Sequence, residues 1–242
     1  MITQRPVDTL PEKAFQAFTR LQHINQSLSA CKGLGKIVIQ QQAQARSVRL
    51  AWLCKLPDKM RLEALTPTGH SVLTLSLDGR YVYILPHTTG GELQKKRMRR
   101  LNLKHVIDIP VPSDDILQLL TGRIPIRDFD TAKLVSGQNS GHTLRLARGL
   151  TGIVQTICFD ESYTHPTRVT YHSGFWHKTA YTVTFNDFKI MDGFEIPATI
   201  TMTADDLTAT FSIRRYWANP EIPDDRFVII DPRGKKDGNP PE

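Results

Sequence analysis

Residues 57–86 are the stretch that most limits what this chain can fold into. Apolar and polar residues alternate there in three short runs, with the period of two that is typical of strands buried on one face. Pro67-Thr68-Gly69 and Asp78-Gly79 separate the runs and supply residues suited to tight reversals. The stretch therefore predicts an antiparallel meander. Its apolar positions are Met60, Leu62 and Ala64, then Leu73, Leu75 and Leu77, then either Tyr81 and Tyr83 or Val82 and Ile84.

The same alternation continues on both sides of the meander. Earlier strands are predicted over residues 36–42 and 48–54, with a polar reversal at Gln40-Gln41-Gln42. Turn residues at Asn186-Asp187, Asp192-Gly193 and Asp205-Asp206 separate later strands. We expect about 11 strands in one large antiparallel sheet, with few helices. The later strands span residues 134–137, 143–147, 153–159, 168–172, 180–186, 188–191, 197–202 and 207–214.

A first helix is predicted over residues 10–30. Thr9 and Glu12 form a capping box, and Pro11 stands in the first turn, where a helix tolerates proline. The apolar side chains fall on about a third of the circumference, so the helix lies on an apolar surface. Gly33 and Gly35 are expected to end this region and to open the strand that follows. The apolar stripe comprises Ala14, Ala17, Phe18, Leu21, Ile24 and Leu28.

A second, shorter helix is predicted over residues 116–121. Ser113-Asp114-Asp115 is interpreted as its N-terminal cap, and Gly122 ends it. The helix carries too many apolar residues for a turn that faces solvent, so most of its sides must be buried. These residues are Ile116, Leu117, Leu119 and Leu120.

The composition is that of a folded domain. Hydrophobic residues make up 40% of the 242 residues, which is enough for a core. No apolar run approaches the roughly 18 residues that a membrane span needs, and the first residues carry no export signal. We expect a flexible leader over residues 1–8, one domain over residues 9–232 and a disordered tail over residues 233–242.

The three cysteines, Cys31, Cys54 and Cys158, cannot all pair within one chain because their number is odd. Cys54 and Cys158 lie in strand-like runs, where a lone thiol usually behaves as a small buried apolar group. The sequence alone still allows one disulfide between two of the three cysteines.

The net charge of +7 comes mostly from one short patch. Removing its five basic residues would leave 7 − 5 = +2. Nucleic-acid binding is one interpretation, but no helix-turn-helix pattern, aromatic RNA-binding run or zinc knuckle supports it. A solvated edge strand and a contact with anionic lipid headgroups are the others. The patch comprises Lys95, Lys96, Arg97, Arg99 and Arg100.

One face of the sheet is apolar throughout. Ile196, Ala198, Ile200 and Met202 share a face, as do Leu207, Ala209, Phe211 and Ile213, with threonines opposite. A curved sheet of this kind encloses either its own packed side chains or a ligand cavity. The candidate cavity residues are Leu50, Trp52, Met60, Leu62, Leu73, Leu75, Ile200, Met202, Phe211 and Ile213.

Catalytic and metal-binding motifs are missing from the sequence. His165, His172 and His177 offer imidazoles, but no Cys or Glu completes a ligand set. Nucleophile-elbow, zinc-protease, Walker and dinucleotide-binding motifs do not occur. The carboxylate pairs Asp114-Asp115, Asp205-Asp206 and Asp224-Asp225 are assigned to caps and turns. We therefore expect that the protein is not an enzyme and that it has no metal site and no cofactor.

Three groups of motifs resemble the LolA/LolB family of lipoprotein carriers and receptors. The first group is residues 57–62, 66–69 and 77–79, which resemble the front half of the LolB type. The second, residues 116–125, is similar to a leucine-rich helix followed by glycine and proline. The third, residues 219–227 and 231–234, resembles the end of LolA carriers. Together these motifs span residues 10–234.

The resemblance implies an incomplete antiparallel β-barrel of about eleven strands, with helices covering one open end and a hydrophobic cavity between them. It implies a monomer that binds lipid or lipoprotein acyl chains, with a LolA-type periplasmic carrier as partner. Localisation would be the Gram-negative periplasm, with an outer-membrane anchor through a lipidated N-terminal cysteine; the first cysteine here is Cys31. The covering residues would be Phe18, Leu21, Ile24, Ile116, Leu119 and Leu120.

Two other functions remain open for the same barrel. It could serve as an envelope-stress sensor or interaction module, or as a packed scaffold without a ligand. The chain also departs from the family at the membrane-facing turn. LolB carries a protruding leucine there, whereas this turn is Pro67-Thr68-Gly69. Threonine offers little apolar area to a bilayer, so we expect weak insertion through this turn.

Overall fold

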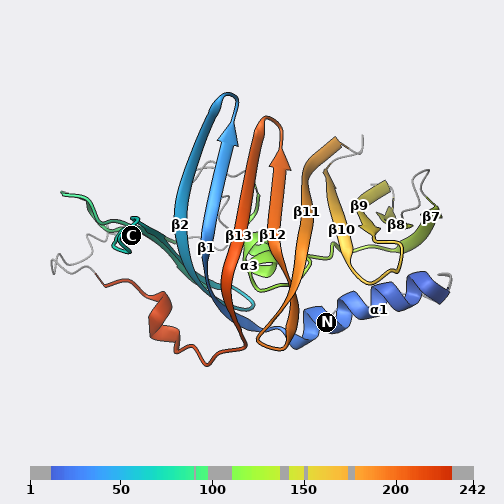
Figure 1. The fold of residues 1–242 in the computed structure, drawn as a ribbon, viewed down its shortest axis with the longest axis horizontal. Coiled ribbons are helices and arrows are strands. Elements are labelled where there is room, and N and C mark those ends of the chain that lie inside the picture. The colour runs from blue at the N-terminus through green and yellow to red at the C-terminus, as the bar shows by residue number, and fades with distance from the viewer. Residues whose placement is uncertain are drawn as a thin grey trace, which may run out of the picture.

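The computed structural model describes residues 12–89, 91–97, 111–136, 142–149, 152–173 and 178–230. Within this part of the chain, thirteen strands form one antiparallel sheet in the order β6-β5-β4-β3-β2-β1-β13-β12-β11-β10-β9-β8-β7. β6 and β7 are the two edges, so the sheet is not closed (Figure 1). The predicted mainly β class and the incomplete antiparallel barrel are confirmed, with thirteen strands in place of about 11.

Two meanders make up the sheet, and one strand pair joins them. The first meander comprises β1 (Ala30–Gln41), β2 (Gln44–Lys55), β3 (Lys59–Leu65), β4 (Ser71–Asp78), β5 (Tyr81–Pro86) and β6 (Gln94–Arg97). The second comprises β7 (Thr131–Ser136), β8 (His142–Arg148), β9 (Gly152–Phe159), β10 (Pro166–Ser173), β11 (Lys178–Met191), β12 (Phe194–Ala204) and β13 (Leu207–Ala218). β1 pairs with β13, and Ile37 lies opposite Phe211.

Two helices lie on one side of the sheet, which we call the inner face. α3 (Ser113–Leu120) lies behind the sheet in Figure 1, and α1 (Glu12–Ser27) runs across the lower ends of the second meander. Phe18 and Leu21 of α1 are buried. The predicted helix over residues 10–30 therefore ends at Ser27, while Thr9 of its capping box lies outside the described residues.

The opposite side, the outer face, is partly covered by the end of the described chain. The 3-10 helix η2 (Asp224–Phe227) lies against β3 and β4. Phe227 is fully buried, and its carbonyl oxygen accepts a hydrogen bond from the hydroxyl of Ser76 at 2.6 Å. Asp224 pairs with Lys55 and Lys59.

The prediction that Gly33 and Gly35 precede the first strand was wrong. Both lie inside β1, which begins six residues before the expected Lys36. The indole ring of Trp52 lies over Gly33, where an added Cβ would come within 2.1 Å of ring carbons. The glycines therefore make room for the ring within the strand.

One predicted hairpin was also wrong, because β11 continues through Asn186-Asp187. Asn186 pairs with Thr199 and Phe188 with Pro197 on the same neighbouring strand. Asp187 adopts a positive φ of 56° within the strand and does not reverse it. The turns at Asp192-Gly193 and Asp205-Asp206 are confirmed.

The cap predicted for the second helix differs from the observed one. α3 begins at Ser113 itself, and Pro112 is its N-cap without a side-chain hydrogen bond. The Ser113 hydroxyl donates to the Asp114 carboxylate at 3.3 Å. Asp115 points into the protein and is 1% exposed.

The three cysteines are free thiols. Cys31 and Cys54 are buried and lie opposite each other on β1 and β2. Burial raises the pKa of the Cys54 thiol well above its ordinary value, and the neighbouring Cys31 raises this pKa further. Among the described helices, none is long and apolar enough to cross a membrane.

Candidate functional site

The inner face of the sheet is a continuous apolar surface. The strand registers place Trp52 opposite Leu62 and Ile200 opposite Phe211, so inward positions of neighbouring strands meet on it. Nine of the ten candidate cavity residues are buried in one hydrophobic cluster, and Leu73 is partly exposed. The nine are Leu50, Trp52, Met60, Leu62, Leu75, Ile200, Met202, Phe211 and Ile213.

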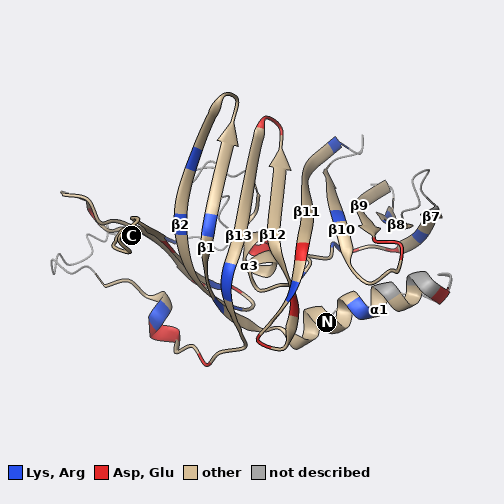
Figure 2. Ribbon diagram, viewed as in Figure 1, with Lys and Arg blue, Asp and Glu red and all other residues tan. Residues whose placement is uncertain are grey.

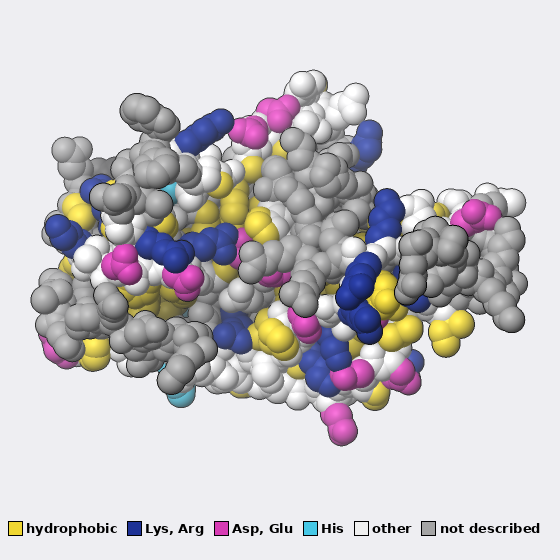
Figure 3. Space-filling model, turned by 180° about the vertical axis from the view of Figure 1, so that it is seen from behind, with side chains coloured by type: hydrophobic (Ala, Val, Ile, Leu, Met, Phe, Trp, Pro, Cys, Tyr) yellow, Lys and Arg dark blue, Asp and Glu magenta, His cyan; other side chains and the backbone are white. Residues whose placement is uncertain are grey.

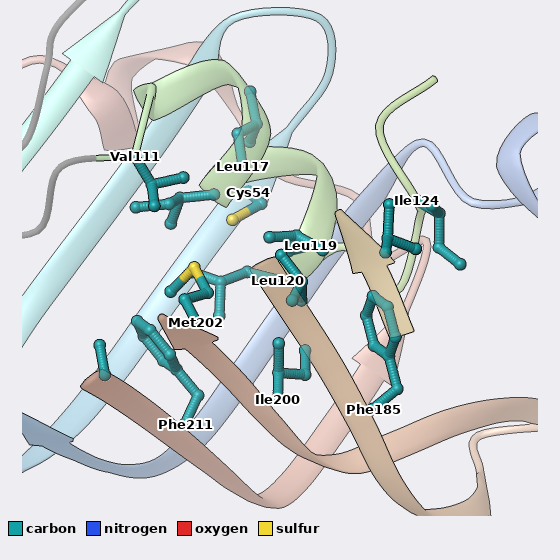
Figure 4. Packing of buried hydrophobic residues seen from close by; sticks show 14 of the residues in the cluster. Cys54, Val111, Leu117, Leu119, Leu120, Ile124, Phe185, Ile200, Met202 and Phe211 are labelled. Atoms are coloured by element: carbon teal, nitrogen blue, oxygen red, sulfur yellow. The ribbon is translucent and has the colours of Figure 1, made fainter. Parts of the chain in front are cut away.

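α3 packs directly on this surface. Figure 4 shows Leu117, Leu119 and Leu120 above the inner-face residues, among them Met202 and Ile200. The Cys31 thiol donates to the carbonyl oxygen of Leu120 at 3.1 Å, which ties the end of the helix to β1. The apolar side chains of α3 therefore occupy the concave side of the sheet.

The residues predicted to cover the apolar face do lie against it. Ile116, Leu119 and Leu120 of α3 are buried. Phe18 and Leu21 of α1 are also buried. Ile24 is partly buried against the same cluster. Seen from behind in Figure 3, apolar side chains gather on this side of the molecule between basic ones.

A buried ionic cluster holds α3 in place. The carboxylate of Asp115 accepts hydrogen bonds from Nη1 and Nη2 of Arg127, at 2.8 and 2.5 Å, and from the Tyr181 hydroxyl at 2.5 Å. The Asp115 side chain is 2% exposed, while that of Arg127 is 36% exposed. Such a bidentate pair fixes both orientation and distance.

Two tyrosines complete this cluster. The Arg127 guanidinium lies 4.7 Å from the ring centroid of Tyr171, and the rings of Tyr171 and Tyr181 stack at 4.4 Å. Burial raises the pKa of both hydroxyls well above the ordinary value. Burial alone would lower the pKa of Arg127, but its hydrogen bond to Asp115 and the neighbouring groups raise it. The guanidinium therefore stays charged.

Buried polar side chains also hold the segment that follows α3. The carbonyl oxygen of Pro125 accepts hydrogen bonds from the Tyr171 hydroxyl at 3.0 Å and from Gln155 at 2.8 Å. The side-chain amide nitrogen of Asn25 of α1 donates to the carbonyl oxygen of Ile124 at 2.7 Å, and its oxygen accepts from the Ile124 N–H at 2.9 Å. The Tyr216 hydroxyl donates to the carbonyl oxygen of Thr121 at 2.9 Å. Side chains from α1 and from the three strands β9, β10 and β13 thus hold this connection.

The sequence analysis missed the role of Asp115, because it assigned this carboxylate to a helix cap. One local signal was present. Asp115 stands four residues before Leu119, so both share a helix face that was already expected to be buried. Its partner Arg127 lies 12 residues away and follows no helical or strand period.

The basic patch lies at a sheet edge as far as the structure describes it. Lys95, Lys96 and Arg97 are exposed on the edge strand β6. The ammonium of Lys95 lies 4.8 Å from the ring centroid of Tyr81 on the adjacent strand. Arg99 and Arg100 lie outside the described residues.

The predicted membrane-facing turn joins β3 and β4. Pro67, Thr68 and Gly69 are exposed, and the hydroxyls of Thr66 and Thr68 lie 2.8 Å apart. Gly69 adopts a φ of 94°, the left-handed region that glycine tolerates.

The histidines considered as metal ligands have separate partners. Nε2 of His165 lies 2.8 Å from the Glu195 carboxylate, and Nε2 of His172 lies 3.1 Å from the Thr156 hydroxyl. His177 lies outside the described residues. Among the described residues, no three His, Cys, Asp or Glu side chains form a group suited to a metal ion.

Comparison with family models gives no match, and none of the curated proteins matches the sequence. Similar folds occur among solved structures. A DUF1329 family protein from Desulfovibrio piger has a TM-score of 0.63 at 9% identity, over 91% of this chain and 98% of that one. A LolA superfamily protein from Nitrosomonas europaea has a TM-score of 0.57 at 14% identity, over 88% of this chain and 97% of that one.

A third similar structure is a domain described as an outer membrane lipoprotein-sorting protein, from Vibrio parahaemolyticus. Its TM-score is 0.57 at 9% identity, over 88% of this chain and 94% of that one. At these identities the similarity shows the fold alone. This chain has a LolA-like fold: an unclosed antiparallel sheet with helices on its inner face.

Proposed function

We propose that the protein is a non-enzymatic lipid-binding protein of the LolA/LolB type, which accepts the acyl chains of lipoproteins or of another lipid. The observation that carries this proposal is the continuous apolar inner face in a LolA-like fold. Each methylene group transferred from water to such a surface contributes about 0.8 kcal/mol, so one long chain provides a large driving force.

An acyl chain reaches this face only where α3 gives way. The leucines of α3 lie on the surface that the chain would contact, so lipid and helix compete for the same apolar area. The polar cluster of Asp115, Arg127 and Tyr181 opposes this exchange, because moving α3 separates a buried charged pair. Binding therefore couples to displacement of α3.

The proposed setting is the cell envelope, in traffic of lipoproteins or lipids to the outer membrane. The similarity to a lipoprotein-sorting domain supports this setting. A LolA-type carrier would be the partner, and the protein would act as a monomer in the periplasm, anchored to the outer membrane. The exposed residues Lys95, Lys96 and Arg97 would contact anionic headgroups, each contributing about 1 kcal/mol near such a surface.

The test is binding of a fluorescent fatty-acid analogue to the purified chain. We expect saturable binding that Leu75→Glu and Phe211→Glu each abolish, because a charge on the apolar face is costly to desolvate. Both positions are at most 3% exposed, so circular dichroism must show that each variant still folds.

Ile190→Glu is the matched control, since this side chain is 81% exposed. It should leave binding unchanged. Absence of saturable binding to the native chain would contradict the proposal. So would equal binding by folded Phe211→Glu and Ile190→Glu variants.

A further inference from the structure

A pocket of about 370 Å³ opens at the junction of the two meanders. Three arginines line it: Arg49 of β2, and Arg214 and Arg215 of β13. Leu34 and Leu65 add apolar surface. The strand registers place Leu34, Arg49, Leu65 and Arg215 on the outer face, away from α3. Figure 2 shows basic segments on the adjacent strands β2, β1 and β13.

A β-bulge brings two of the arginines to the same side. Leu34 pairs with Arg215, but the next residue, Gly35, pairs with Ile213, so Arg214 has no opposite residue on β1. In a regular strand consecutive side chains point to opposite faces, and one of these arginines would enter the core. Here both are exposed. Bulges of this kind re-aim side chains next to functional sites.

Gly35 is required for this local geometry. A Cβ at this position would lie 2.3 Å from the backbone oxygen of Ser212, directly across from the bulge. Glycine at this position lets the bulged strand β13 approach β1 closely. The bulge in turn places Arg214 and Arg215 on the same side.

The pocket concentrates positive charge without an acidic side chain in its lining. Nη1 of Arg49 donates to the carbonyl oxygen of Pro67 at 2.5 Å, which holds its guanidinium beside the turn. Among the described residues, the side chains of Arg214 and Arg215 make no hydrogen bond or ion pair, and no acidic residue lines the pocket. Lys36, opposite Arg49, adds a further positive charge on the outer face.

We propose that this pocket binds a phosphate ester. Guanidinium groups match the oxygens of phosphate with paired hydrogen bonds, and neighbouring like charges are relieved by a bound anion. The volume lies in the range of about 300–1,000 Å³ that small-molecule sites occupy, so the ester's carbon body fits beside the leucines. The exposed arginines lie away from α3 and the proposed acyl-binding face lies under it, although Leu50 lines the pocket as well as that face.

The first experiment titrates the full chain with glycerol 3-phosphate by calorimetry, with glycerol as the ligand control. We expect the double variant R214Q/R215Q to lower affinity at least about tenfold, because it removes two charged hydrogen-bond donors. R168Q/K189Q is the matched control: both residues are exposed on other strands, and it removes the same charge. It should change affinity less than about twofold.

The second experiment identifies the source of the phosphate. Co-sedimentation with phosphatidylglycerol vesicles, against phosphatidylcholine vesicles, is measured for the same variants. Vesicle binding that R214Q/R215Q abolishes and R168Q/K189Q retains supports a membrane lipid as the source. Binding of glycerol 3-phosphate without such vesicle binding supports a soluble ester.

Two outcomes would overturn the proposal. One is an equal loss of ester and vesicle binding in R214Q/R215Q and R168Q/K189Q, which would make the effect one of net charge. The other is no Arg214- and Arg215-dependent binding in either experiment. Fatty-acid binding should be unchanged in R214Q/R215Q, so failure of this site and failure of the acyl-binding face are distinguishable.

Discussion

Asp115 and Arg127 form a bidentate ion pair in which one partner is buried and the other reaches solvent. The Asp115 side chain is 2% exposed and that of Arg127 is 36% exposed. Arg127 also lies against the ring of Tyr171 at 4.7 Å. Removal of Arg127 would therefore leave a buried carboxylate without its ion-pair partner, whereas removal of the Asp115 charge would leave a guanidinium that water can reach.

This asymmetry predicts unequal costs of mutation. Arg127→Met leaves the buried carboxylate with the Tyr181 hydroxyl alone and should lower the free energy of unfolding by about 3–5 kcal/mol. Asp115→Asn should cost less, because the released guanidinium can hydrate. Urea unfolding of both variants and of the double variant Asp115→Asn with Arg127→Met checks this. Strictly additive losses in that cycle would show that the pair does not couple.

Gly33→Ala should destabilise the protein through the indole of Trp52. The added methyl group would lie 2.1 Å from two ring carbons, and overpacking of this kind costs about 1–3 kcal/mol. Trp52→Leu in the same chain should reduce the cost of Gly33→Ala, because it removes the ring. The indole Nε1 has no hydrogen-bond partner among the described residues, so this change breaks no such bond. Thermal unfolding midpoints that do not move with Gly33→Ala would refute the prediction.

The attachment of η2 should weaken in acid. Hydrogen bonds from Lys55 and Lys59 lower the pKa of Asp224 to about 2. Because this pKa is lower than in the unfolded chain, the ion pairs stabilise the folded state above about pH 4, and this contribution is lost as the pH falls through about 2. The difference in urea midpoint between the native chain and Asp224→Asn should therefore be constant near neutrality and narrow below about pH 4. A difference that grows in acid would have the wrong sign.

The turn between β3 and β4 should limit delivery of cargo to membranes. Thr68 is exposed but presents a hydroxyl and one methyl group. Thr68→Leu adds apolar area worth about 1–2 kcal/mol on insertion, so transfer of a lipoprotein from a carrier complex into liposomes should rise about tenfold. Thr68→Ser is the matched control. Efficient transfer by the native chain, with no gain from Thr68→Leu, would show that this turn is not limiting.

Alternation within single strands made most of the sheet predictable from the sequence. The runs around Met60, Leu75 and Phe211 carry their own inward face, and the turns at Asp78-Gly79 and Asp192-Gly193 need only local backbone freedom. Local patterns say nothing about partners far apart in sequence. The bulge at Arg214 depends on pairing between β1 and β13, and the burial of Asp115 depends on Arg127 and Tyr181.

The inner-face residues were predicted, but the way α3 is held there was not. The burial of Leu119 and Leu120 can be predicted because they are apolar. Gln155 and Tyr171 are also buried, but as polar residues in strands they give no such indication. Both side chains donate a hydrogen bond to the carbonyl oxygen of Pro125, which only the tertiary fold brings close to them. This bond satisfies the polar groups in the interior. Polar groups that satisfy a distant backbone leave no periodic trace in the sequence.

The pairing of β1 with β13 has a consequence for the order in which the sheet can form during synthesis. The first and last strands of the described residues meet in the middle of the sheet, while its edges, β6 and β7, come from the interior of the chain. Each meander can form from local contacts as it emerges, but the seam between them must wait until residue 218 is available. Until then β1 lacks one of its two neighbours in the sheet, and a chaperone that covers this strand would keep it available for β13.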